Sequence, residues 1–560
     1  MSASLPLLLL FTVALVGASV FSASGQQTPA NMSDAFPSVT TSLPDSANEP
    51  TSAKNEFDLL ILNGRIIDGT GNPWYYSDLG IHGNRITAMG KLAGAKARKV
   101  IDADGHYVAP GFIDPHTHAA DGLETKELSH ACPMLAQGIT MIVANPDGGG
   151  PVDMERQRES LLKDGLGVHV AQFVPHGSIR REVMGTENRH ATADEMEQMK
   201  QRVRKAMEQG AFGLSSGIFY VPGSFAPTLE LIELNHIVAE FDGVHQSHIR
   251  DESDYTIGLV AAVDEIIEIT RETGATGIIT HIKALGTPVW GASAEIISNI
   301  KEARQDGLQI FTDQYPYSAS ATTMRASLVP AWAREGGTDA LRKRLADETI
   351  QDQIMAGITG NLARRGGAER LQYRRFEADP SVEGRNLADI ASERGLTPEE
   401  LVLSQIRLGN PGLVSFNMHD DDIRTFMKQP WNMTCSDGGY VPFGSGVPHP
   451  RNYGSFPRKI RKYVFGEELM SLEDAVRSMT SLTAGVFGLH DRGLLRPGMV
   501  ADVVVFDPER VTDRATYHEP HQYSEGMVWV IVNGGIAIGN GEFTSGMHGE
   551  IVTKPRHGTR

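Results

Sequence analysis

The sequence predicts an α/β fold: a (β/α)₈ TIM-type barrel with a small β-sandwich domain formed by the N- and C-terminal segments. Three observations support this prediction. The body of the chain alternates short apolar runs with polar stretches of helical periodicity. The apolar runs number eight, which suits a barrel. Both ends of the body carry short β-like segments with hairpin turns. Periodicity alone leaves a doubly wound parallel sheet open as an alternative.

The predicted barrel domain spans residues 109–490. Polar segments with helical spacing, such as 193–209 and 255–273, separate the expected strands. Residues 330–430 interrupt the alternation and predict an insertion with helices of its own. The eight expected strands are 111–118, 139–145, 168–175, 212–217, 244–249, 277–282, 310–315 and 433–436.

The small β-domain is predicted from both ends of the chain, residues 56–108 and 491–545. Asn63-Gly64 and Gly83-Asn84 are hairpin signals in the first part. The second part repeats the same apolar texture. Residues 546–560 are expected to form a C-terminal tail.

The N-terminus has the texture of a signal peptide (1–25) followed by a disordered spacer (26–55). The stretch from Leu5 to Val20 is almost wholly apolar and ends in small residues, but no basic residue precedes it. It is short for a membrane span, so we expect export to the periplasm or the medium, with a retained membrane anchor as the alternative. The spacer is rich in Ser, Thr, Pro and Asn.

Composition excludes several classes of partner. The 560 residues carry 51 Lys and Arg against 69 Asp and Glu, a net charge of −18. This balance argues against nucleic acid and against any membrane contact beyond export. The only cysteines, Cys132 and Cys435, belong to no CxxC or Cys/His cluster, so we expect both to be packing residues. The sequence gives no indication of the oligomeric state.

Four of the expected strands end in residue types that bind metal. The first ends in His116-Thr-His118, the fifth in His248, the sixth in His281 and the last in Asp437. Residues i and i+2 of a strand point the same way, and the carboxyl ends of barrel strands meet at one mouth. A lone histidine after a strand is more often structural, and a lone aspartate more often a turn residue. Five such residues at the ends of four strands favour a site for one or two divalent cations, with Zn²⁺ preferred.

The segment Val108–His118 resembles the entry motif of the amidohydrolase superfamily, and later motifs resemble its D-aminoacylase branch. The resemblance runs in the family's order from about Phe57 to Gly541. The matching motifs are 247–252, 280–286, 313–317, 436–439, 449–458, 479–484 and 491–502.

The resemblance implies a zinc-dependent deacylase of N-acyl-D-amino acids. It makes His116, His118, His248 and His281 metal ligands, and Asp437 a ligand that is also the acid/base. D-aminoacylases often add a bridging cysteine in a Gly-Asn-Cys-Gly turn. This chain has Asp147 at that position. We hypothesise that Asp147 replaces the cysteine, since a carboxylate can bridge two cations; a plain turn residue is the alternative.

Such a site would use a metal-activated water, with Asp437 moving the proton to the leaving nitrogen. No GxSxG turn leads into a predicted helix, which disfavours a serine nucleophile. The substrate carboxylate needs donors near the metal, and strand ends offer candidates. The resemblance places Lys283 and Tyr315 in the substrate pocket. For Lys283 and Arg250, a salt bridge at the barrel rim is the alternative. The candidates are Lys283, Tyr315, Arg250 and Tyr220, with His176, His449 and Arg451 as further rim residues.

Other functions fit the same metal site. A cyclic-amide hydrolase resembling dihydroorotase or hydantoinase, or a dipeptidase, would need the same ligands. A non-catalytic scaffold is disfavoured because every strand-end ligand is present. The preference for the D-form follows from the resemblance alone, and neither the acyl group nor the side-chain preference follows from the residues.

Overall fold

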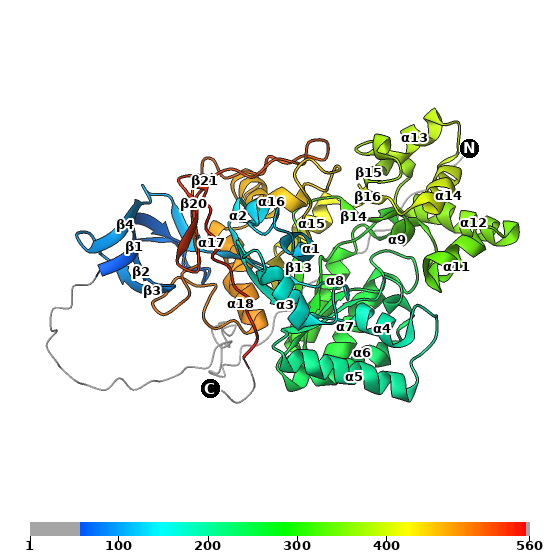
Figure 1. The fold of residues 1–560 in the computed structure, drawn as a ribbon, viewed down its shortest axis with the longest axis horizontal. Helices are drawn as coiled ribbons and strands as arrows, with labels where there is room; N and C mark the ends of the chain where they lie inside the picture. Colours follow the sequence, from blue (N-terminus) through cyan, green and yellow to red (C-terminus); the bar gives the residue numbers. More distant parts are fainter. Residues whose placement is uncertain (1–55, 556–560) are drawn as a thin grey trace, which may run out of the picture. The chain divides into compact units, whose positions relative to one another are not determined.

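The computed structural model describes residues 56–555 (Figure 1). The predicted signal peptide, the predicted spacer and the last five residues of the predicted tail lie outside the described residues. No helix between residues 56 and 555 is long and apolar enough to cross a membrane.

Residues 109–490 are called the catalytic segment below. Its parallel strands follow one another in chain order and form two sheets. The first sheet contains β6 (Phe112–Asp114), β7 (Ile139–Ala144) and β8 (His169–Gln172). The second contains β9 (Val174–Pro175), β10 (Gly213–Gly217), β11 (Val244–His248), β12 (Thr276–Ile279), β13 (Ile310–Gln314) and β17 (Asn432–Thr434). Each predicted run overlaps one of these strands, except that 168–175 contains both β8 and β9; β12 and β17 begin one residue before their predicted runs.

The two sheets adjoin at both ends. β8 and β9 are separated along the chain only by Phe173. At the opposite end, the backbone N–H of Asp437 donates to the carbonyl of His116 at 2.9 Å, and that of His118 donates to Gly438 at 2.7 Å. The last strand therefore lies next to the first.

The two helices predicted explicitly are present. Helix α5 (Ala193–Glu208) begins with a capping box between Thr192 and Glu195. Helix α7 (Leu259–Thr273) begins four residues later than predicted. The Asp251 carboxylate accepts the backbone N–H groups of Thr256 (2.5 Å) and Gly258 (3.1 Å) and holds that stretch as a loop.

The other helices of the catalytic segment connect its strands or follow the last one (Figure 1). They are α1 (Ala120–Leu123), α2 (Cys132–Leu135), α3 (Met154–Leu162), α4 (His176–Met184), α6 (Thr228–Glu240), α8 (Ser293–Gln305), α15 (Asp420–Met427), α16 (Arg451–Arg458), α17 (Leu472–Met479) and α18 (Ser481–Phe487). Short 3₁₀ turns occupy Gly223–Phe225 and Thr287–Val289, and a π-helical segment, η5, occupies Lys459–Gly466.

The insertion begins at Ser320, earlier than predicted, and has its own apolar core. Its antiparallel strands are β14 (Ser320–Thr323), β16 (Gly412–Ser415) and β15 (Leu371–Arg375), in that order. Its helices are α9 (Met324–Leu328), α10 (Ala331–Arg334), α11 (Gly337–Arg344), α12 (Glu348–Arg364), α13 (Leu387–Glu393) and α14 (Pro398–Leu408), with 3₁₀ turns at Ala368–Arg370 and Pro380–Val382.

Strands from both ends of the chain pair in a single nine-stranded sheet, where the sequence predicted a sandwich. Its order is β21-β20-β19-β18-β5-β1-β2-β3, and β4 pairs with β1. The antiparallel pairing of β5 with β18 joins the two halves. The strands are β1 (Glu56–Ile66), β2 (Tyr75–His82), β3 (Arg85–Gly90), β4 (Lys96–Asp102), β5 (Tyr107–Pro110), β18 (Val503–Phe506), β19 (Met527–Val532), β20 (Gly535–Gly539) and β21 (Glu542–Phe543).

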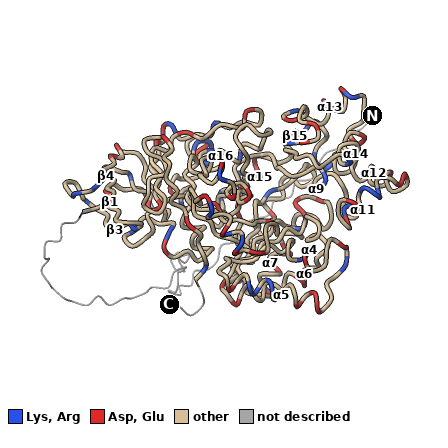
Figure 2. Tube along the Cα trace, in the orientation of Figure 1, with Lys and Arg blue, Asp and Glu red and all other residues tan. Residues whose placement is uncertain are grey.

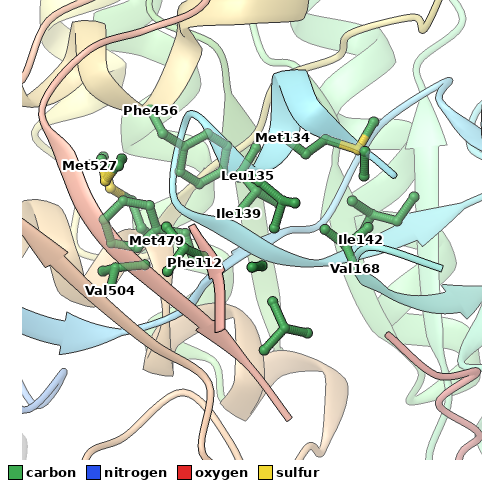
Figure 3. Packing of buried hydrophobic residues seen from close by; sticks show 14 of the residues in the cluster. Phe112, Met134, Leu135, Ile139, Ile142, Val168, Phe456, Met479, Val504 and Met527 are labelled. Carbon is green, nitrogen blue, oxygen red and sulfur yellow. The ribbon is translucent and has the colours of Figure 1, made fainter. Parts of the chain in front are cut away.

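One apolar cluster connects this sheet to the catalytic segment. Phe112 of β6 stacks on Phe456 of α16, with ring centroids 5.8 Å apart. Val504 and Met527 extend into the same cluster from β18 and β19 (Figure 3). Truncating such an aromatic side chain to alanine costs about 3–5 kcal/mol. The cluster therefore fixes the start of the first ligand-bearing strand.

The first part of the predicted C-terminal tail pairs with β8. The backbone N–H of Val170 donates to Glu550, and that of Val552 donates to Val170, both at 2.9 Å. Positions of Lys and Arg are interspersed with positions of Asp and Glu along the described backbone (Figure 2).

Candidate metal centre and active site

Six potential metal ligands meet where the parallel strands end. His116 and His118 follow β6, Asp147 follows β7, His248 ends β11, His281 follows β12 and Asp437 follows β17. Ligand atoms within 4.8 Å of one another form three overlapping groups: His116, His118 and Asp437; His116, Asp147 and His281; and His248 and His281 with Glu252. The structure thus brings together every residue that the sequence nominated as a ligand.

The carboxylate of Asp147 lies among the four histidines of the site. Its oxygens are 3.3 Å from His118 Nε2 and 3.7 Å from His116 Nε2. They are also 3.6 Å from His281 Nε2 and 3.8 Å from His248 Nδ1. Asp147 therefore lies within 4.0 Å of a ring nitrogen of each of the four histidines.

Asp437 is held against the first group. Its Oδ1 lies 3.4 Å from His118 Nε2 and 3.5 Å from His116 Nε2. Its Oδ2 is 2.7 Å from a guanidinium nitrogen of Arg451. One oxygen therefore faces the ligand cluster while the other is fixed by a cation.

Buried atoms without partners show that the residues fit a cation. His116 Nε2 and Asp147 Oδ1 are buried, and neither makes a hydrogen bond within the described part of the chain. Leaving such groups unpaired is costly, and a divalent cation would satisfy both. Asp147 (φ 55°), His281 (φ 35°) and Asp437 (φ 47°) also adopt left-handed backbone conformations, which are rare outside glycine. Strain of this kind concentrates at functional sites.

Neighbouring side chains orient the histidines. The Thr280 hydroxyl lies 2.6 Å from His116 Nδ1 and 2.8 Å from the Asp313 carboxylate, so the His116 ring presents Nε2 to the cluster. Glu252 Oε1 is 3.1 Å from His281 Nδ1. Carboxylates behind ligating histidines are typical of metal sites.

The electrostatics keep both aspartates ionised. Burial by itself would raise the pKa of Asp437, but Arg451 and His281 lower it well below its ordinary value. The pKa of Asp147 is likewise lowered well below its ordinary range, because the surrounding histidines outweigh its burial. Both carboxylates are therefore available as ligands at neutral pH.

Lys283 is at the site, but a carboxylate neutralises it. Its Nζ lies 2.5 Å from Glu252 Oε1 and 2.6 Å from His281 Nδ1. Burial would raise the pKa of Glu252, and Lys283 lowers it below its ordinary value. The sequence interpretation missed Glu252, although its spacing of four residues from His248 was a usable signal.

The other predicted substrate residues divide into two sets. Tyr315 is buried beside Arg451, whose guanidinium lies 4.7 Å from its ring centroid. The ring of Tyr220 lies 4.7 Å from that of His248. Arg250, in contrast, pairs with the buried Glu265 at 2.6 Å and lines neither cavity of the site. The prediction for Arg250 is corrected on this point: β11 ends at His248, so Arg250 does not continue the strand alternation that would have turned it toward the site.

The rim residues named from sequence also separate. Arg451 contacts Asp437, as described above. His176 is buried against Glu230 at 2.9 Å. His449 lies 3.0 Å from the Ala319 carbonyl. These two histidines are held by structural contacts.

The two cysteines contribute no ligand to the cluster. Cys435 is buried in an apolar cluster behind Asp437. Cys132 is half-buried at the first turn of α2. Burial raises the pKa of both thiols. Both cysteines therefore have the surroundings of packing residues.

Two cavities share the ligand cluster. An outer cavity of about 690 Å³ reaches from His118, Asp147 and Asp437 to the insertion. An inner recess of about 40 Å³ lies between the histidines and Lys283, Tyr315 and Arg451. The volume of the outer cavity suits a small molecule. Insertion residues on the outer wall are Ala321, Thr322, Thr323, Arg374 and Arg375.

Comparison with known proteins agrees with this geometry. Residues 99–538 match the model of the amidohydrolase family. The chain is 33% identical to a D-aminoacylase of Alcaligenes xylosoxydans xylosoxydans over 90% of this chain and 99% of that protein. It is 35% identical to an N-acyl-D-glutamate deacylase of the same organism, over 86% and 93% respectively.

A solved structure gives the same result. The N-acyl-D-glutamate deacylase of Bordetella bronchiseptica, complexed with zinc and a phosphonate inhibitor that mimics the tetrahedral intermediate, superposes with a TM-score of 0.76. It is 34% identical, and the alignment covers 89% of this chain and 100% of that one. Sequence, fold and ligand arrangement together place the chain in the amidohydrolase family.

Proposed function

We propose that this protein is a zinc-dependent hydrolase of the amide bond of N-acyl-D-amino acids. The observation that carries the proposal is the convergence of four histidines and two aspartates at one set of strand ends, with buried ligand atoms left without partners. The deacylase names of its full-length relatives favour this activity over cyclic-amide or dipeptide hydrolysis. We also propose that the two parallel sheets form one closed (β/α)₈ barrel, supported by the contact between His116 and Asp437.

The chemistry divides between the ions and the chain. The histidines with Asp147 and Asp437 would hold one or two zinc ions, which when bound polarise the substrate carbonyl and acidify water. The ionised Asp437 accepts the proton of the attacking water and returns it to the leaving nitrogen. Arg451 keeps that carboxylate oriented and charged. Asp147 would contribute a carboxylate that lies within reach of all four histidines.

The inner recess suits the carboxylate of the amino acid. Lys283, Tyr315 and Arg451 line it within reach of the ligand cluster. Tyr220 lines both cavities and would close one side of the scissile amide. Because Glu252 already neutralises Lys283, the substrate carboxylate would share that cation instead of meeting a free one.

We further propose export, supported by the apolar run near the N-terminus. Cell fractionation of a C-terminally tagged full chain tests this. Export predicts a shortened protein in the periplasm or the medium, whereas a full-length membrane-bound or cytoplasmic product would contradict it.

The activity is tested by free-amine release from matched N-acetyl-D- and N-acetyl-L-methionine by the zinc-loaded protein, with Asp437→Asn as the control. Release from the D-form alone, lost in the variant, is expected. Release from neither form, with zinc still bound, would contradict the deacylase proposal and favour cyclic amides or dipeptides.

A further inference from the structure

Arg374 is a cation of the outer cavity without a counter-ion in the described chain. It lines the cavity from β15 of the insertion. Two other arginines of the cavity wall are paired: Arg451 with Asp437 at 2.7 Å and Arg375 with Glu377 at 2.8 Å. No carboxylate of residues 56–555 lies within 4.0 Å of the Arg374 guanidinium.

The local backbone is shaped around this side chain. On β16, Leu413 pairs with Tyr373 and Gly412 pairs with Arg375, so Arg374 lies in a register shift without a partner of its own. Such bulges redirect a side chain out of the regular alternation. A Cβ on Gly412 would lie 3.0 Å from Arg374 Nε, so the absence of a side chain there leaves the guanidinium its space.

The unpaired position has an energetic cost. Burial, helped by nearby Arg451 and partly offset by Asp437, lowers the pKa of Arg374 to about 10. The charged form is therefore less favourable here than in water. An anion bound at Arg374 would relieve that cost and would be held by the planar donor fork of the guanidinium.

We propose that Arg374 forms a second anion subsite, which binds a substrate carboxylate other than the α-carboxylate. The inference rests on the proposed function, in which the α-carboxylate occupies the inner recess beside Lys283 and Arg451. The preferred substrates are then dianionic N-acyl-D-amino acids. The second carboxylate is on the side chain, as in D-aspartate or D-glutamate, or on the acyl group, as in an N-succinyl amide.

The test compares kcat/KM within two pairs of substrates that differ in one charge. The first pair is N-acetyl-D-glutamate and N-acetyl-D-glutamine. The second is N-succinyl-D-methionine and N-butyryl-D-methionine. The native enzyme is expected to favour the dianion of at least one pair by about tenfold or more, as a charged hydrogen bond implies. The pair that responds identifies the source of the carboxylate.

Arg374→Gln is expected to abolish that preference through a raised KM for the dianions, while turnover of the monoanionic substrates is retained. Arg374→Lys, which keeps the charge but not the fork, should retain part of it. Arg385→Gln is the matched control, because Arg385 lies in the same insertion and pairs with Glu393 at the surface. The control should keep the full preference.

Three outcomes would overturn the subsite: no charge preference in the native enzyme, a preference that survives in Arg374→Gln, or an equal loss on both members of each pair. The retained rate on the monoanionic substrates shows that the variant is folded. If the native enzyme releases amine from none of the four compounds, the proposed function is refuted as well. This outcome is distinct from failure of the subsite alone, in which amine is still released.

Discussion

The backbone N–H of Asp437 donates to the carbonyl of His116 at 2.9 Å, so the proposed acid/base lies directly beside a first-strand ligand more than 300 residues earlier in the chain. Asp437 and His116 also face each other through their side chains at 3.5 Å. The centre therefore depends on the two ends of the catalytic segment meeting. This dependence explains why the apolar cluster at Phe112 adjoins the ligand-bearing strand.

Asp147 is expected to determine how much metal is bound. Asp147→Ala should lower the zinc content and reduce kcat/KM by about 10- to 100-fold or more, because the site loses the carboxylate that lies among its four histidines. Asp147→Cys should retain zinc, since a thiolate is a softer ligand that zinc accepts. Metal analysis after gel filtration measures the content. Unchanged zinc and turnover in Asp147→Ala would make Asp147 a plain turn residue.

Lys283 and Glu252 are expected to be energetically coupled. Breaking a buried ion pair from one side leaves an uncompensated charge and costs about 3–5 kcal/mol. Lys283→Met and Glu252→Gln should each destabilise the protein, and the double variant should cost less than their sum. Urea unfolding of the zinc-loaded proteins measures this. Lys283→Met should also raise KM for N-acyl amino acids, and additive stabilities with an unchanged KM would contradict both roles.

Arg250 is expected to affect stability and not substrate binding. Arg250→Met leaves the carboxylate of Glu265 without its main cation. The free energy of unfolding should fall by about 3–5 kcal/mol, because Glu265 is buried. KM should stay within about twofold of the native value. A raised KM with unchanged stability would return Arg250 to the substrate site.

The sequence predicted the strand-end ligands because each of them follows a short apolar run whose end could be located. His248 and Asp437 could be assigned to the site from the alternation of side chains along a strand and from the rule that the carboxyl ends of barrel strands meet at one mouth. The family resemblance added the expectation that Asp147 joins them. The backbone places each of the three in one of three groups that overlap at His116 and His281.

The remaining site residues depend on packing that periodicity does not report. Arg250 leaves the site because the chain turns after His248 and brings it to Glu265 on α7. Arg374 reaches the cavity through a bulge in a strand of the insertion, and no sequence signal marked that register shift. Glu252 lies in a quoted motif, but its role depends on meeting Lys283 from the next strand. Distances between loops, more than residue types, decided these cases.

Lys459 predicts how stability changes with pH. It is buried on η5, where it donates to Thr434 and Ser478 at 2.8 Å. Burial lowers its pKa from 10.5 to about 7. Between these values the unfolded chain binds a proton that the native chain lacks, so raising the pH stabilises the fold by up to about 1.4 kcal/mol per unit.

Lys459→Met should remove this contribution. Urea unfolding near about pH 7 and about pH 9 should show a smaller gain in stability for the variant than for the native protein. Lys462→Met is the control, since Lys462 is a part-exposed lysine on the same segment that pairs with Glu467 at 3.7 Å. Equal pH dependence in Lys459→Met and the native protein would show that Lys459 stays charged when folded.

The strand-end cluster is proposed to be a zinc centre that hydrolyses amides. The most direct measurement is a titration of zinc into chelator-treated enzyme, with amine release from N-acetyl-D-methionine recorded at each addition. Activity should be absent without metal and reach its plateau at about one or two zinc ions per chain. In Asp437→Asn, zinc binding should largely persist while turnover falls by about 10²-fold or more. Full turnover in the metal-free enzyme would contradict the account.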